Sequence, residues 1–357
     1  MFKLLIVDDS ALMRRHLTEL FQSLGTFAIE TARHGAEAVE FNRLWQPDVV
    51  LLDINMPVMD GLTALARMMV ERPVPVVMLS SLTHRGALAT FEALNLGALD
   101  YVPKPDGTIS LSLDRVQDEL VAKVRAAARV RHKWRGGTHL TAGADRPPPA
   151  APTPQASRPA EPFQGLVVIG VSTGGPRTLE MILPQLPAAW GWAVLVAQHM
   201  PAQFSRPFAE RMGRQCALKV IEVCEPVPLK RDTIYIGQGG KDLRIARRGR
   251  DWVAFPKPPQ ETLLWHPSVD DLVQSVLQHW DPTRTIGVLL TGMGYDGAES
   301  LAQLKLRGGL TIAESEETAV VFGMPHSLIE RGGATVVLPA HRIAPQIVAW
   351  TLKKVVQ

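Results

Sequence analysis

The sequence predicts two α/β domains, each built on a mostly parallel β-sheet and joined by a proline-rich tether. Short apolar runs recur about every 20–25 residues with helix-like stretches between them, which is typical of parallel strands with right-handed helical crossovers. The pattern stops near residue 128 and restarts near residue 164, and seven prolines lie between Pro147 and Pro162. We therefore expect domains over 1–128 and 164–357, separated by an extended basic linker over 129–163.

Composition and charge exclude several classes of protein. Hydrophobic residues make up 46% and charged residues 20%, as in ordinary globular proteins, and a net charge of +3 does not by itself indicate nucleic-acid binding. No apolar run approaches the roughly 18 residues of a membrane span, and the N-terminus lacks a signal peptide's apolar stretch. The two cysteines, Cys216 and Cys224, exclude a disulfide framework. We expect a cytoplasmic protein that neither binds nucleic acid nor inserts into membranes.

Five apolar runs are expected to form the strands of the first domain. They are KLLIV (3–7), FAIETA (27–32), DVVLLD (48–53), PVVMLSS (75–81) and ALDYVPKP (98–105). The first helix is expected from Ala11 to Leu24, because apolar side chains recur on one face and Gly25 follows as a C-terminal stop. Ligands of such sheets bind beyond the carboxyl ends of the strands, so the strand ends are where a site is expected.

Polar side chains stand at these strand ends. Asp8 and Asp9 follow the first strand, Asp53 ends the third, Ser80 ends the fourth and Lys104 follows the fifth. Two carboxylates about 4 Å apart repel by roughly 4 kcal/mol at an effective dielectric constant near 20, and a bound Mg²⁺ would relieve this repulsion. A lysine and a hydroxyl beside such a site suit phosphoryl transfer, with Asp53 as the nucleophile. In the alternative interpretation, the first two aspartates cap a helix and Asp53 begins a turn.

These residues resemble the receiver domain of two-component response regulators over about 120 residues. The resemblance implies a flavodoxin-like (βα)5 fold in which Asp53 accepts a phosphoryl group from a histidine kinase. It implies a Mg²⁺ site made by Asp8, Asp9, Asp53 and the backbone carbonyl of Asn55. It further implies that Ser80 and Tyr101 are switch residues and that Lys104 contacts the phosphate. Serine in place of threonine at position 80 is a mild departure from the family pattern.

In the second domain, a serine, a histidine and an aspartate each follow an expected strand. GLVVIG (165–170) leads into the G-x-S-x-G turn that carries Ser172, WAVLVAQ (192–198) leads to His199, and TIGVLL (285–290) precedes the loop with Asp296. A serine becomes a nucleophile beside a base, and the base needs an orienting carboxylate. The chain order Ser–His–Asp disfavours the ordinary α/β-hydrolases, whose order is Ser–Asp–His.

Each of these residues also has a structural interpretation. Ser172 could cap the next helix, which is expected to begin near Pro176, or its glycine-rich turn could cradle a phosphate. His199 could be an ordinary buried histidine, and Asp296 could serve turn geometry alone. The remaining histidines have no metal-ligand spacing, and we expect both cysteines to be structural.

Five short motifs together resemble the catalytic domain of the chemotaxis protein-glutamate methylesterase family, CheB. They are Ser172-Thr173-Gly174-Gly175-Pro176, Gln198-His199-Met200-Pro201, Pro267-Ser268-Val269-Asp270, Thr291-Gly292-Met293-Gly294 and Asp296-Gly297-Ala298. The resemblance implies a doubly wound, mostly parallel α/β domain with a β-hairpin and no cofactor for the esterase. It implies that Ser172, His199 and Asp296 form a catalytic triad, assisted at the oxyanion by Thr173 and Met293.

The implied activity is hydrolysis of glutamate methyl esters, with deamidation of some glutamines, on the cytoplasmic helices of chemoreceptors. The resemblance also implies that the receiver inhibits the esterase until Asp53 is phosphorylated, and we expect a monomer. Two other interpretations stay open at this point. The second domain could be a partner-binding output domain without catalysis, or a small-molecule hydrolase under receiver control.

Three positions depart from the usual family pattern and bear on substrate preference. Gln238 and Asp242 lie in Tyr235-Ile236-Gly237-Gln238-Gly239-Gly240-Lys241-Asp242, where the family usually has Ala-Pro-Gly-Gly-x-His. His266 precedes Pro267 where arginine or lysine is common. Four arginines between positions 244 and 250 are expected on a hairpin, either as a solvated turn or as a surface that attracts acidic receptor helices.

Overall fold

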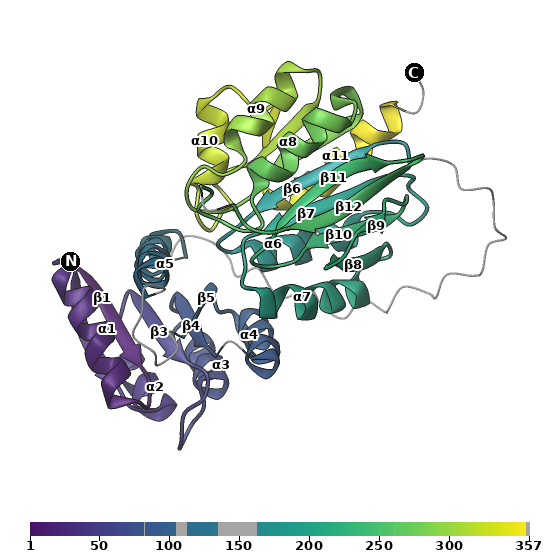
Figure 1. Cartoon of the computed structure of the whole chain (residues 1–357). Coiled ribbons are helices and arrows are strands. Elements are labelled where there is room, and N and C mark those ends of the chain that lie inside the picture. The colour runs from purple at the N-terminus through teal and green to yellow at the C-terminus, as the bar shows by residue number, and fades with distance from the viewer. Residues whose placement is uncertain (82, 105–112, 135–162, 261, 355–357) are drawn as a thin grey trace. The chain divides into compact units, whose positions relative to one another are not determined.

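The computed structural model describes residues 1–81, 83–104, 113–134, 163–260 and 262–354 (Figure 1). They form two compact units, Met1–Leu140 and Thr141–Gln357, each with its own parallel sheet. The last helix of the first unit reaches Trp134, past residue 128, and the proline-rich stretch of the expected linker lies outside the described residues. None of the described helices is both long and apolar enough to cross a membrane.

The first unit is a five-stranded sheet in which each expected apolar run forms a strand. Its elements in chain order are β1 (Phe2–Val7), α1 (Ala11–Ser23), β2 (Phe27–Ala32), α2 (Gly35–Leu44), β3 (Val49–Asp53), α3 (Gly61–Glu71), β4 (Val76–Ser80), α4 (His84–Leu96), β5 (Asp100–Pro103) and α5 (Leu113–Trp134). The strand order is β2-β1-β3-β4-β5, and all pairs are parallel. This is the predicted (βα)5 architecture.

Helices cover both faces of this sheet. α2, α3 and α4 pack in series on one face, and α1 and α5 are joined across the other by His16 and Gln117. Every residue of β3 and β4 is therefore buried, which explains why these strands read as continuous apolar runs rather than alternating ones. α1 begins at the N-cap Ser10, whose hydroxyl accepts a hydrogen bond from the backbone of Met13.

The second unit contains a seven-stranded parallel sheet and a smaller antiparallel sheet. Its elements are β6 (Leu166–Val171), α6 (Gly175–Ile182), η1 (Leu183–Gln185), β7 (Ala193–Gln198), α7 (Ala202–Gln215), β8 (Lys219–Val223), β9 (Val227–Pro228), β10 (Thr233–Gly237), β11 (Asp242–Arg248), β12 (Asp251–Lys257), α8 (Val269–His279), η2 (Pro282–Arg284), β13 (Thr285–Leu289), α9 (Ala298–Leu306), β14 (Leu310–Glu314), α10 (Met324–Glu330), β15 (Val336–Leu338) and α11 (Ala340–Lys354).

The order of the large sheet fixes where a site is expected. The strands run β15-β14-β13-β6-β7-β10-β8, so the first strand of the domain, β6, lies at the centre between β7 and β13. The strands that follow β6 in the chain, β7, β8 and β10, lie on one side of it, and the later strands β13, β14 and β15 lie on the other side. The sheet is therefore doubly wound, with a switch point beside β6. α6, α7 and α11 cover one face, and α8, α9 and α10 cover the other (Figure 1).

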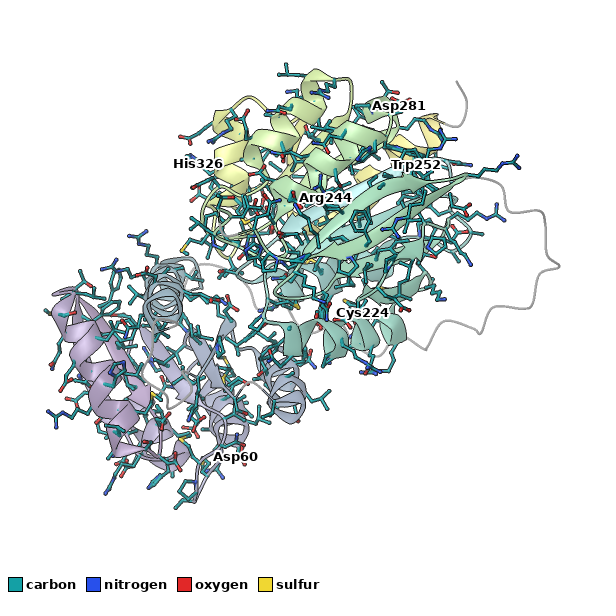
Figure 2. All side chains as sticks on the ribbon, in the orientation of Figure 1. Asp60, Cys224, Arg244, Trp252, Asp281 and His326 are labelled. Atoms are coloured by element: carbon teal, nitrogen blue, oxygen red, sulfur yellow. The ribbon has the colours of Figure 1, made fainter. Side chains whose placement is uncertain are left out.

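The predicted hairpin is present as β11 and β12, which pair antiparallel from Asp242 opposite Lys257 to Arg248 opposite Asp251. Arg244 projects from β11, where its guanidinium donates to Gln278 of α8, and Trp252 lies on the neighbouring strand (Figure 2).

Both cysteines are free thiols: Cys216 is buried and Cys224 is exposed.

Candidate functional site

The predicted serine and histidine follow neighbouring strands at the switch point. β6 and β7 pair up to Val171 opposite Gln198, and the backbone N–H of His199 continues the ladder by donating to Val171 O at 3.1 Å. On the other side, the N–H of Ser172 donates to Thr291 O at 2.9 Å, in the loop that follows β13. Parallel pairing thus brings together three loops that are far apart in the sequence.

The predicted histidine and aspartate are in direct contact. His199 Nε2 lies 2.8 Å from Asp296 Oδ2, and the two side chains are only 8% and 4% exposed. The carboxylate of Asp296 accepts hydrogen bonds from four groups: His199 Nε2, Ser268 Oγ (3.0 Å), Val269 N (2.7 Å) and Asp270 N (3.0 Å). The last two are the first backbone N–H groups of α8, so a helix N-terminus, which favours negative charge, holds the carboxylate.

This setting keeps Asp296 ionised. Burial raises the pKa of the Asp296 carboxyl group. The hydrogen bond and charge of His199, together with the N–H groups of α8, lower it by more than burial raises it, so the pKa lies below its ordinary value. An ionised Asp296 accepts a hydrogen bond from the Nε2–H group of His199 and would stabilise the imidazolium that forms during proton transfer.

The remaining ring nitrogen, His199 Nδ1, is buried and has no hydrogen-bond partner among the described residues. It is therefore the nitrogen left to accept a proton, which reverses the use of the two nitrogens in the chymotrypsin triad. No hydrogen bond joins Ser172 Oγ to His199 within the described part of the chain. Catalytic hydrogen bonds of this kind commonly shorten only when substrate binds.

Two backbone N–H groups beside Ser172 are unused. Those of Thr173 and Met293 donate to no acceptor among the residues that the structure describes. Their loops are fixed to each other, because Thr291 Oγ1 donates to Thr173 O at 2.8 Å and the buried Glu314 accepts from Thr291 N at 2.8 Å. Free N–H groups on a rigid loop are the donors that an oxyanion requires.

Three residues that hold this arrangement were not predicted as site residues. Gln198 Nε2 donates to the carbonyl oxygens of Ser172 at 3.1 Å and His199 at 2.9 Å. Ser268 holds Asp296, and Glu314 holds the Thr291 loop. The sequence nevertheless contained a feature that could have pointed to each of them. Gln198 and Glu314 end buried parallel strands, and Ser268 stands in a quoted motif before an expected helix.

An aromatic pair forms one wall of the site. The Trp265 ring stacks parallel on His199 with centroids 5.8 Å apart, and Tyr295, which is 53% exposed, meets Trp265 edge-on at 5.4 Å. Gly294 has a φ of +87°, and a Cβ there would come within 2.7 Å of the indole ring. Only glycine allows the Trp265 ring to lie this close to the loop.

The acidic residues of the first unit also converge. Ligand atoms of Asp8, Asp9 and Asp53 all lie within 4.8 Å of one another. Lys104 Nζ lies 2.9 Å from Asp8 Oδ2 and 2.8 Å from Asp53 Oδ2. Burial raises the pKa of Asp53, and its contacts with Lys104 offset only part of that rise. Lys104 pairs with two of the three carboxylates, so the cluster keeps a net negative charge and hard oxygen donors, which fit Mg²⁺.

The predicted switch residues, Ser80 and Tyr101, contact groups other than the three carboxylates. Ser80 Oγ lies 2.7 Å from Thr90 Oγ1 and 3.2 Å from Gly86 O, so its hydroxyl is engaged by α4. Tyr101 is 3% exposed, with the ammonium of Lys123 over its ring. The backbone of Asn55 hydrogen-bonds the Asp53 carboxylate from the turn after β3.

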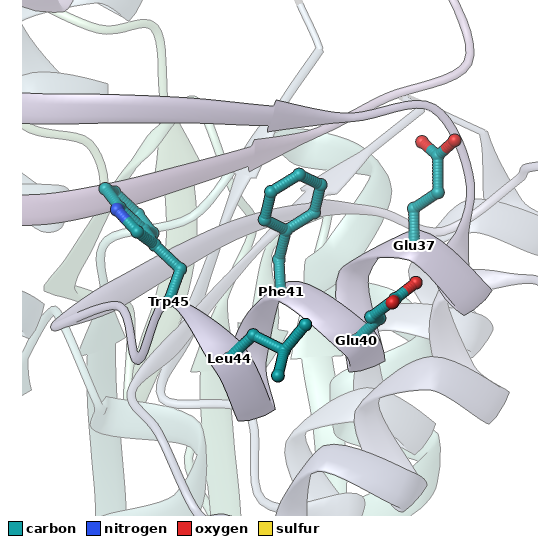
Figure 3. A pocket seen from close by; sticks show the side chains of 5 residues that line it. All are labelled: Glu37, Glu40, Phe41, Leu44 and Trp45. Carbon is teal, nitrogen blue, oxygen red and sulfur yellow. The ribbon is translucent and has the colours of Figure 1, made fainter.

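A separate cavity of about 520 Å³ lies along α2 of the first unit (Figure 3). It is lined by Glu37, Glu40, Phe41, Leu44 and Trp45, and none of these is a predicted site residue. Glu37 is already paired with Arg33 at 2.6 Å. This cavity therefore adds nothing to either predicted site.

Comparison with known proteins identifies both units. Residues 4–112 match the response regulator receiver domain family, and residues 167–347 match the CheB methylesterase family. A protein-glutamate methylesterase/protein-glutamine glutaminase of Rhodospirillum rubrum is 51% identical over 356 residues, which are 98% of this chain and 96% of that protein. The chain belongs to the CheB methylesterase family. This membership favours the predicted esterase over a non-catalytic output domain.

Two further similar proteins support the same family assignment. A protein of the same name from Rhodopseudomonas palustris is 48% identical and covers 98% of each chain. The crystal structure of the Thermotoga maritima CheB methylesterase catalytic domain matches with a TM-score of 0.50 and 38% identity, over 52% of this chain and 98% of that one. The predicted two-domain α/β fold is thus confirmed, whereas the roles of individual residues stay predictions.

Two of the departures from the CheB pattern contact each other. His266 Nδ1 lies 2.8 Å from Asp242 Oδ1, and the Asp242 side chain is fully buried. The third departure, Gln238, turns the chain before β11, where its carbonyl oxygen accepts from Lys241 N at 3.2 Å. The first two changes therefore form one pair rather than two independent substitutions.

Proposed function

We propose that this chain is a phosphorylation-regulated protein-glutamate methylesterase and protein-glutamine deamidase that acts on chemoreceptors. The observation that carries the proposal is the buried contact of His199 Nε2 with Asp296 beside the loop of Ser172, at the switch point of the sheet. The names of the 51% and 48% identical relatives support both activities.

In the first step, Ser172 Oγ attacks the ester carbonyl carbon and its proton moves to His199 Nδ1, the nitrogen without a partner. Asp296 holds the opposite nitrogen and stabilises the imidazolium. The N–H groups of Thr173 and Met293 bind the oxyanion that develops on the carbonyl oxygen. Loss of one such donor lowers the rate by about a hundredfold to a thousandfold in comparable sites.

Collapse of the tetrahedral intermediate breaks the bond to the methoxy group and returns the proton, so methanol leaves and Ser172 is acylated. A glutamine side chain follows the same steps with ammonia as the leaving group. Water then attacks the acyl-enzyme with His199 again as base, which restores the serine and yields a glutamate carboxylate. The esterase requires no cofactor in this scheme.

Control comes from the receiver. Asp8, Asp9 and Asp53 would hold Mg²⁺, which when bound neutralises phosphoryl oxygens during transfer from a histidine kinase. After phosphorylation, the phosphoryl group on Asp53 carries roughly 1.5 to 2 negative charges in place of the single charge of the carboxylate. Lys104 would pair with the new group, and Ser80 would leave its contacts with α4 to bind it. Rearrangement of Ser80 and Tyr101 then relieves inhibition of the esterase.

The proposed substrates lie on the cytoplasmic helices of chemoreceptors, so the proposed location is the cytoplasm. We propose that the chain acts as a monomer, without nucleic acid and without inserting into the membrane. The extended proline-rich tether expected from the sequence between the two domains would let the receiver block and release the esterase.

The test is methanol release from methylated chemoreceptor membranes, measured with and without a small phosphodonor. Ser172→Ala should abolish release, whereas Ser275→Ala, a buried serine on α8, should retain it. Release stimulated by the phosphodonor supports the whole scheme. If the wild-type protein with phosphorylated Asp53 releases no methanol, the scheme is refuted; release from generic esters alone would favour a small-molecule hydrolase.

A further inference from the structure

We propose that Asp242 is a positioning residue that fixes both the histidine and the aspartate of the active site through the segment Trp265–Ser268. This inference rests on the proposed function. It concerns the two neighbouring departures from the family pattern, Asp242 and His266, and assigns them one joint task.

The anchor is a single carboxylate oxygen. Asp242 begins β11 and is 0% exposed, and its Oδ1 accepts two hydrogen bonds, from His266 Nδ1 and from the backbone N–H of Ser268, each at 2.8 Å. These two donors flank Pro267. Asp242 therefore holds the segment on both sides of that proline.

The segment held in this way touches both members of the buried pair. At one end, Trp265 stacks on the His199 ring with an interplanar angle of 2°. At the other end, Ser268 Oγ donates to Asp296 Oδ1 at 3.0 Å, and the adjacent N–H of Val269 donates to Oδ2 at 2.7 Å. A shift of the segment would thus move the stacking surface of the histidine and two donors of the carboxylate together.

Asp242 itself touches neither reacting group. Its second oxygen, Oδ2, is buried without a hydrogen-bond partner among the described residues. Burying a carboxyl group with one oxygen unpaired is unfavourable for folding. The role of Asp242 is therefore better explained by the geometry that it imposes on its neighbours than by a gain in stability. Two hydrogen bonds that converge on one oxygen hold the chain on both sides of Pro267, which suits a residue that positions others.

The test uses the full chain and a fluorophosphonate probe, which needs no receptor. Ser172 Oγ attacks phosphorus, fluoride leaves, and His199 takes the serine proton, so the labelling rate reports on nucleophile activation. Asp242→Ala should lower the maximal labelling rate about tenfold to a hundredfold, because misplacement of about 1 Å can cost that much. The probe concentration at half-saturation should not change, since the hydrogen bonds of Asp242 go to His266 and Ser268 and not to Ser172 or His199.

Conservative and matched variants separate positioning from loss of structure. Asp242→Asn keeps an acceptor oxygen and should label within about threefold of wild type. His266→Ala removes one hydrogen bond and should give an intermediate rate even if Asp242→Ala folds poorly. Ser275→Ala, which removes the acceptor of Ile245 N in the same β11–α8 interface, should label normally.

Two results overturn the inference in distinguishable ways. Normal maximal labelling of a folded Asp242→Ala protein, or slower labelling caused only by weaker probe binding, refutes the positioning role alone. A wild-type protein that the probe does not label at Ser172 refutes the proposed function, and the positioning role with it.

Discussion

Replacing Asp296 by asparagine tests the aspartate–histidine arrangement most directly. Each oxygen of Asp296 accepts from at least one N–H donor: Oδ2 from His199 and Val269, and Oδ1 from Asp270. An asparagine presents one NH2 group, so whichever way the amide turns, a donor meets a donor. The substitution therefore leaves a buried N–H unpaired in either orientation.

The expected losses follow from these contacts. An unpaired buried donor costs about 1–3 kcal/mol, and loss of the charge at the α8 N-terminus adds up to about 1 kcal/mol. A total of about 1–4 kcal/mol corresponds to a fall in Tm of roughly 2–16 °C for a domain of this size. The rate of methanol release should fall about 10⁴-fold, as for the corresponding substitution in a serine protease triad.

The loss of stability caused by Asp296→Asn should become smaller as the pH falls. Because the pKa of Asp296 is lowered in the folded protein, its ionised form stabilises the fold fully above the unfolded value of about 3.9. That contribution is lost as the pH falls through the lower folded pKa. The difference in Tm between wild type and Asp296→Asn should be constant from pH 6 to 8 and shrink below about pH 4.

The assays are calorimetric unfolding across this pH range and methanol release at neutral pH. Asp281→Asn is the matched control, because this exposed aspartate only caps η2 and asparagine caps a helix equally well. An Asp296→Asn protein that keeps more than a tenth of the wild-type rate, or melts at the wild-type temperature at neutral pH, would refute the reasoning.

Substitutions at Gln198, Thr90 and Asp53 should affect the nucleophile loop, the basal rate and the phosphodonor response, respectively. Gln198→Leu removes both hydrogen bonds to the carbonyl oxygens of Ser172 and His199 and should slow fluorophosphonate labelling of Ser172 about tenfold; an unchanged rate would exclude this role. Thr90→Val frees Ser80 from one hydrogen bond of about 1 kcal/mol, so methanol release without phosphodonor should rise about fivefold, and an unchanged basal rate would argue against α4 restraint. Asp53→Asn, or removal of Mg²⁺ with a chelator, should abolish stimulation by phosphodonor and leave the basal rate intact; stimulation that persists would place the phosphorylation site elsewhere.

The strand ends explain why much of the site was predictable. In a parallel sheet, side chains that directly follow central strands must lie at one edge, whatever the loops do afterwards. Ser172 and His199 follow β6 and β7 within one or two residues, and Asp8 and Asp53 stand at the ends of β1 and β3. Local sequence was sufficient for these positions.

Other contacts were out of reach because they join segments whose spacing the sequence does not encode. The pairing of Asp242 with His266, two departures from the family pattern, depends on how β11 meets the turn before α8. The stacking of Trp265 on His199 depends on the same turn and on the open space at Gly294.

The sequence by itself therefore determined the two α/β domains, their family resemblance and the residues that stand at the strand ends, because apolar periodicity and short motifs are local properties. Only the tertiary structure decided which nitrogen of His199 meets Asp296 and which helix holds that carboxylate. The physical reason is that hydrogen bonds act over about 3 Å, whereas the groups they join here lie up to 97 residues apart in the chain.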